Sequence, residues 1–106
     1  MKIEKYIIIK TSTDSIDNAN LLSEELFKHK LSPCITIKSC QSKYIWDNEQ
    51  KNEKQFDVEI KTKLSKTKKI LHIISPIHSY ECPEIISTEF VILNDKYKDW
   101  FDSECP

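Results

Sequence analysis

Glycine and arginine are both absent from this 106-residue chain, and each absence excludes recognisable classes of functional site. Without glycine the chain contains no P-loop, no dinucleotide-binding fingerprint and no nucleophile elbow, because each motif requires glycine at fixed positions. Any left-handed turn position should therefore fall to asparagine or aspartate, which tolerate that conformation best after glycine. Without arginine, phosphate chemistry that depends on a positioned arginine is excluded as well.

Long apolar runs and an excess of charge of one sign are also missing. The first apolar run spans only Tyr6 to Ile9, too short for a signal-peptide core or a membrane span. Sixteen basic residues are offset by seventeen acidic ones, and no basic stripe is interleaved with aromatic residues. We therefore expect neither a membrane nor a nucleic-acid partner. The rest of the composition is that of a globular protein, and residues 1–106 should form a single domain.

Cysteine is present but not in the spacings of a zinc site or a redox motif. Cys34, Cys40, Cys82 and Cys105 form no Cys-x-x-Cys pair and no Cys/His ligand pattern. Because the first apolar run is too short for a signal-peptide core, we expect a cytoplasmic protein. In that reducing compartment the four cysteines should be free thiols and not disulfides.

Hydrophobic periodicity predicts alternating strands and helices. Strands are expected at residues 5–11, 34–46, 56–64 and 85–93, with residues 47–55 as an exposed polar hairpin tip. Helices are expected between Thr13 and Lys30, between a Ser65 cap and Pro76, and after an Asn94 cap, with residues 103–106 as a tail. This order, β-α-β-β-α-β followed by a helix, predicts an α+β, ferredoxin-like fold. The open sheet face and the long hairpin predict self-association.

The clearest strand signal lies in residues 56–64, which alternate between apolar and charged side chains. Phe56, Val58, Ile60 and Leu64 should face a core. Lys61 should lie on the opposite, solvated face.

The densest group of reactive side chains is His78-Ser79-Tyr80-Glu81-Cys82-Pro83-Glu84. Pro83 disfavours a helix here and predicts an extended approach to a strand beginning near residue 85. The segment is either an ordinary polar connector or a place where ligands bind. Imidazole and thiolate groups suit Cu(I), Cu(II) and Zn(II), and His78, Cys34 and Cys82 could supply them.

Three blocks of residues resemble those of one known family. The first block, Leu31-Ser32-Pro33-Cys34-Ile35-Thr36-Ile37, is similar to Leu-Ala-Ala-Cys-Val-Asn-Ile. The second, Ser42-Lys43-Tyr44-Ile45-Trp46 together with Ile60-Lys61-Thr62, is similar to Ser-Ile-Tyr-x-Trp together with Ile-Lys-Thr. The third, residues 78–86, is similar to His-Pro-Tyr-Glu-Val-Pro-Glu-Ile-Ile. These blocks belong to the divalent-cation tolerance protein CutA family, which the chain resembles over nearly its full length.

The resemblance implies a ferredoxin-like homotrimer with clefts between subunits, and an architecture similar to PII signalling proteins. It implies tolerance of copper and other divalent metals, without catalytic activity or an organic cofactor. Copper or another divalent cation would bind weakly. The residues implied at the cleft are Trp46, Lys61 and Tyr80 for a small ligand, and His78, Glu81, Cys34 and Glu84 for a metal ion.

Several positions depart from the family pattern. Asn48 stands where the family has a glycine, Ser79 and Cys82 replace a proline and a valine, and Gln55 replaces a glutamate. The Gln55 replacement bears directly on ligand binding.

Two alternative functions follow from the same residues. The first is a non-catalytic scaffold that binds an anionic metabolite near Lys61, with metal binding incidental. The second is an enzyme with Cys34 as nucleophile and His78 as base. No oxyanion-hole motif accompanies that pair, and we expect no catalysis.

Overall fold

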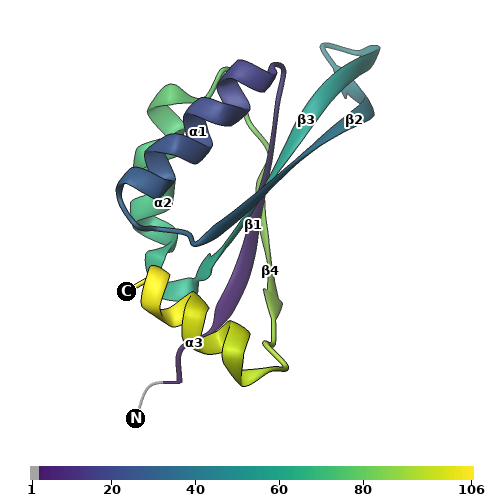
Figure 1. Cartoon of the computed structure of the whole chain (residues 1–106). Helices are drawn as coiled ribbons and strands as arrows, with labels where there is room; N and C mark the ends of the chain where they lie inside the picture. The colour runs from purple at the N-terminus through teal and green to yellow at the C-terminus, as the bar shows by residue number, and fades with distance from the viewer. Residues whose placement is uncertain (1–2) are drawn as a thin grey trace.

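The computed structural model describes residues 3–106 as one four-stranded antiparallel sheet with three α-helices (Figure 1). The elements are β1 Tyr6–Thr13, α1 Ile16–Lys28, β2 Cys34–Trp46, β3 Glu49–Lys63, a 3-10 turn Leu64–Lys66, α2 Thr67–Ile77, β4 Ile85–Phe90 and α3 Asp95–Glu104. The strand order β2-β3-β1-β4 confirms the predicted α+β, ferredoxin-like fold. Residues 1–2, which belong to the predicted domain of residues 1–106, lie outside the described residues.

Helices α1 and α2 lie together against one face of the sheet, and the core fills the space between these layers (Figure 1). Alternate residues of β1 and β3 meet apolar stripes from the two helices. The buried core is Ile7, Ile9, Ala19, Leu22, Leu26, Leu31, Val58, Ile60, Ile70 and Ile74. Burial of each Ile or Leu side chain contributes about 1.5–3 kcal/mol. No helix within residues 3–106 is long and apolar enough to cross a membrane.

The predicted alternation of residues 56–64 is confirmed except at its end. Val58 and Ile60 are fully buried, and Phe56 packs against the core. Leu64 is 47% exposed, because the chain leaves the strand there for the 3-10 turn. On the opposite face, Lys38 pairs with Glu59 over 3.1 Å.

In the hairpin of β2 and β3, the paired strands are longer and the connecting loop is shorter than predicted. Cross-strand pairing continues as far as Trp46 and Glu49, so residues 49–55 belong to β3 and not to the expected tip. The turn is Asp47-Asn48, with φ angles of 51° and 63°. Two central residues at positive φ are what a two-residue hairpin loop requires, and aspartate and asparagine supply them without glycine, as predicted. The hairpin extends beyond the helical layer (Figure 1).

The left-handed residue that follows helix α1 is a lysine, whereas asparagine or aspartate was predicted at such positions. Lys30 has φ 54°, and its N–H donates to the carbonyl of Phe27 over 3.0 Å. The N–H of Leu31 donates to the carbonyl of Leu26, also over 3.0 Å. These two bonds form a Schellman motif, in which the left-handed position normally carries glycine or asparagine.

Two boundaries differ from the prediction because tertiary contacts decide them. The expected Ser65 cap is wrong, because residues 64–66 form the 3-10 turn and the Ser65 hydroxyl donates to Glu4 over 3.0 Å. Helix α2 ends at Ile77, one residue beyond Pro76. Asn94 is the N-cap of α3 as predicted, although its side chain makes no capping bond.

The C-terminal elements also depart from the expected bounds. Strand β4 ends at Phe90 and not at Leu93, because its partner β1 begins at Tyr6, opposite Phe90. The predicted tail is wrong, since α3 continues to Glu104 and Cys105 is fully buried. The thiol of Cys105 lies 3.6 Å from the carbonyl of Leu31.

Candidate functional site

His78 opens the segment between α2 and β4, and both of its ring nitrogens are hydrogen-bonded. Nδ1 accepts from the backbone N–H of Tyr80 over 3.0 Å, and Nε2 lies 2.9 Å from the hydroxyl of Thr11. Because Nδ1 accepts, the proton of a neutral ring resides on Nε2, which donates to Thr11. Burial lowers the pKa of His78, against opposing effects of Asp14 and the Ser12 backbone. A metal ion could reach this imidazole only by displacing one of these bonds.

The next residue, Ser79, fixes the segment to the start of α1. Its hydroxyl donates to Asp14 over 2.7 Å, and its N–H donates to the amide oxygen of Asn18 over 3.2 Å. The amide nitrogen of Asn18 donates in turn to the carbonyl of Ile77 over 2.9 Å. These bonds hold the segment in place although it belongs to no helix or strand.

Tyr80 connects the segment to the long hairpin. Its hydroxyl oxygen accepts from the amide nitrogen of Gln55 over 2.8 Å, and its ring centroid lies 5.7 Å from that of His78. Burial raises the pKa of the Tyr80 phenol, while the Gln55 bond lowers it and nearby acidic side chains raise it. The neutral Tyr80 side chain is therefore held between the end of α2 and β3.

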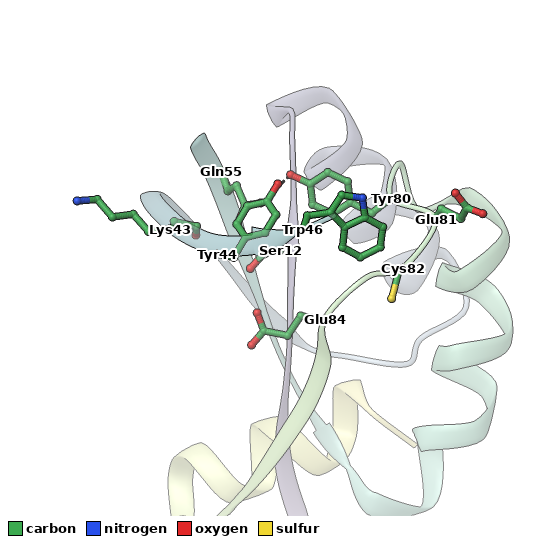
Figure 2. A pocket seen from close by; sticks show the side chains of 10 residues that line it. Ser12, Lys43, Tyr44, Trp46, Gln55, Tyr80, Glu81, Cys82 and Glu84 are labelled. Carbon is green, nitrogen blue, oxygen red and sulfur yellow. Dashed lines mark hydrogen bonds between the residues drawn. The ribbon is translucent and has the colours of Figure 1, made fainter. Parts of the chain in front are cut away.

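On the hairpin side of Tyr80 lies an open cavity of about 550 Å³ (Figure 2). Its walls come from β1, the hairpin and the segment before β4. They are formed by Ser12, Ser42, Lys43, Tyr44, Trp46, Gln55, Tyr80, Glu81, Cys82 and Glu84. In Figure 2, Glu81 and Lys43 extend outward on opposite sides.

Oxygen and sulfur donors outnumber cationic groups around this cavity. Glu81, Glu84 and the exposed Cys82 thiol line it, and Lys43 is the single lysine among the lining residues of the described chain. Glu84 also lies 3.8 Å from Lys10 on the sheet face below. The arrangement favours a cation over an anion.

The structure gathers four of the seven predicted site residues. Trp46, Tyr80, Glu81 and Glu84 line the cavity. His78 lies behind Tyr80 and supports it through the backbone bond described above.

The other two predicted residues lie elsewhere on the sheet. Cys34 and Lys61 are opposite each other in the β2–β3 register, at the start of β2, whereas the cavity uses the far end of that strand. Within residues 3–106, no three His, Cys, Asp or Glu side chains are close enough to hold a metal ion. The predicted metal set is therefore not assembled by one chain, and its ligand roles stay predictions.

On the hairpin side of the cavity, the sequence assigned a ligand role to Trp46 but none to its neighbours. Ser42, Lys43 and Tyr44 line it together with Ser12 of β1. Their sequence signal was membership of the same block as Trp46, since the register that brings them to Tyr80 is a long-range property.

Comparison with known proteins agrees with this fold and this segment. Residues 7–104 match the family model of the CutA1 divalent ion tolerance protein. The divalent-cation tolerance protein CutA of Pyrococcus horikoshii is 24% identical over 98 residues, covering 92% of this chain and 96% of that protein.

Solved structures show the same architecture. The divalent ion tolerance protein CutA1 from Ehrlichia chaffeensis has a TM-score of 0.89 and 26% identity, with 99% of both chains covered. The periplasmic divalent cation tolerance protein CutA from Archaeoglobus fulgidus has a TM-score of 0.90 and 22% identity, covering 95% of this chain and 99% of that chain. With almost its whole length matched by the family model, this chain belongs to the CutA1 divalent ion tolerance family.

Proposed function

We propose that this protein binds a divalent cation, copper among them, in the cavity beside Tyr80, and so contributes to tolerance of such ions. The observation that carries the proposal is the charge of the cavity, where Glu81, Glu84 and the Cys82 thiol stand against Lys43 in the described lining and against Lys10, which lies 3.8 Å from Glu84. Carboxylate and thiolate donors together suit borderline ions such as Zn(II) and Cu(II). An anionic metabolite in the same place would face both carboxylates, so we do not propose one here.

We propose further that a homotrimer completes the cavity. The strand order leaves β2 and β4 as unpaired edges of the sheet within this chain. Large apolar side chains of these two edge strands are exposed, with Ile45 at 66% and Trp46 at 49% on β2 and Ile86 at 50% on β4. A neighbouring copy would cover these side chains and add donors to a set that one chain leaves incomplete.

The proposed role is non-catalytic. Cys34 lies opposite Lys61 in the β2–β3 register, while the His78 ring is hydrogen-bonded to Thr11 of β1. Cys34 and His78 therefore do not form the nucleophile–base pair that an enzyme would need. We place the protein in the cytoplasm, because all four cysteines are free. Alkylation of intact cells with a thiol reagent that crosses membranes, followed by mass analysis, should find these thiols reduced; disulfides in the isolated protein would contradict this location.

Titration calorimetry with Zn(II) on chelator-treated protein tests the cation site directly, since Zn(II) does not oxidise thiols. Glu84→Gln and Cys82→Val should each weaken binding about tenfold or more, as expected when a charged ligand is lost. Glu104→Gln, which removes the same charge from α3, should bind as the unchanged protein does. Equal affinities in all three variants would refute the site, and the same comparison can then be made with Cu(II).

Sedimentation equilibrium tests the assembly. The protein should behave as three chains of 12.5 kDa, and Trp46→Ser should shift the population toward single chains. A monomer with undiminished Zn(II) affinity would contradict the proposed role of the neighbouring copy.

A further inference from the structure

A second hollow lies at the opposite end of α2 from the Tyr80 cavity. Helix α1 ends and α2 begins in the same region of the helical layer (Figure 1), and between them is an open groove of about 700 Å³. Six basic side chains line this groove: His29, Lys30, Lys66, Lys68, Lys69 and His72. We refer to it as the basic groove.

The basic groove carries an excess of positive side-chain charge. No acidic side chain lines it among the described residues. None of its four lysines has a carboxylate within 4.0 Å in residues 3–106, although five lysines elsewhere do: Lys5, Lys10, Lys38, Lys51 and Lys63. Within the groove only His29 faces an acid, Glu25, at 3.9 Å. Because the whole chain has a net charge of −1, this excess of positive charge belongs to the groove and not to the protein as a whole.

These lysines occupy positions where they oppose local stability. The first turn of α2 contains no acidic residue, and Lys66 at its N-cap provides no side-chain bond, so lysine charges face the positive end of the helix dipole. Lys30 adopts φ 54°, a conformation that is unfavourable for a side chain with a Cβ. An anion bound in the groove would bring negative charge to the positive end of the α2 dipole and so offset the unfavourable placing of the lysines.

We propose that the basic groove binds a compact polyphosphate anion, such as inorganic triphosphate. Lysine attracts phosphate as a point charge, and several lysines around one hollow favour a ligand whose negative charges are closely spaced. The rest of the lining is Leu31, Ile73 and Pro106, so the groove contains no Phe, Tyr or Trp ring of the kind that single-stranded nucleic-acid sites use for base stacking. The groove contains neither Lys61 nor any residue of the Tyr80 cavity, so this binding is separate from the proposed cation site.

Titration calorimetry with sodium triphosphate at low salt tests the proposal. The double variant Lys68→Gln/Lys69→Gln should lose about tenfold or more in affinity. Its matched control is Lys96→Gln/Lys98→Gln, which removes the same charge from exposed positions of α3 and should stay within about twofold of the unchanged protein. The melting temperature of Lys68→Gln/Lys69→Gln should be equal or higher, because charges that oppose the helix dipole are removed. Lost affinity therefore cannot be ascribed to unfolding.

Three results would overturn the assignment. One is the absence of saturable heat with triphosphate. Another is an equal loss of affinity in the two double variants, which would indicate general attraction to net charge. The third is tighter binding, at the same salt concentration, of a short DNA duplex or of vesicles with anionic headgroups, which would identify a different class of partner.

Discussion

The amide nitrogen of Gln55 donates a hydrogen bond to the Tyr80 hydroxyl oxygen over 2.8 Å and so joins β3 to the segment that precedes β4. These residues are distant in sequence and form one wall of the Tyr80 cavity. The direction of the bond matters, because the resemblance to the family implies a glutamate at the position of Gln55. A carboxylate at this position would accept the hydroxyl proton and add negative charge to the cavity.

Gln55→Glu should therefore strengthen cation binding. The new carboxylate would add to the negative charge of the cavity that Glu81 and Glu84 also line, and we expect Zn(II) affinity to rise about tenfold by calorimetry. The side chain is only 6% exposed, so the variant should also unfold at a lower denaturant concentration without metal. Gln55→Leu, which removes the bond without adding charge, serves as control. A gain in Zn(II) affinity with leucine, or none with glutamate, would contradict the cation site.

Acidification should weaken the protein through His78. Burial lowers the pKa of His78 below its ordinary value of 6.5, so below that pH the unfolded chain binds a proton that the folded chain does not. Stability from this residue is complete above pH 6.5 and decreases as the pH falls from there toward the lower folded-state pKa. Urea unfolding at a series of pH values should show a smaller acid loss in His78→Gln than in the unchanged protein. His72→Gln, at an exposed position, should retain the full loss.

Lys30→Gly should stabilise the fold. Glycine adopts φ 54° without the Cβ clash that lysine has, and we expect a gain of about 1 kcal/mol in the free energy of unfolding. Asn48→Gly places glycine at φ 63° as well, but asparagine already tolerates that region, so the gain should be smaller. Urea midpoints of the two variants, measured side by side, provide the check. A larger gain at Asn48 would show that the lysine conformation is not strained.

Tyr6→Phe should loosen the attachment of α3. The Tyr6 hydroxyl donates to Asp102 over 2.7 Å, and burial together with this bond raises the pKa of Tyr6 to about 12. Loss of one hydrogen bond at this half-buried position should cost about 1 kcal/mol, with the carboxylate still 3.5 Å from Lys63. Tyr44→Phe, which removes an exposed bond to Glu53, should leave stability unchanged. Denaturant unfolding of both variants measures the difference, and equal losses would contradict a specific role for Tyr6.

Local patterns in the sequence determined which segments form strands and helices. Period-two alternation located the core residues of β3, and helical spacing located the buried faces of α1 and α2. The absence of glycine predicted aspartate or asparagine at left-handed turn positions, which is confirmed at Asp47 and Asn48 and wrong at Lys30. The resemblance of three blocks identified the family, and the family model matched residues 7–104. Each of these signals involves residues close together in the chain, or blocks in a fixed order.

Only the tertiary structure decided what those segments bring together. The hairpin register places Gln55 at Tyr80 and leaves Cys34 and Lys61 at the other end of β2, which divides the residue set predicted for one cleft. The chain shows no basic stripe in sequence, yet the packing of α1 beside α2 gathers lysines from two distant turns around one groove. Periodicity describes one element at a time, whereas these juxtapositions depend on strand register and helix packing, which are fixed by contacts between elements far apart in the chain.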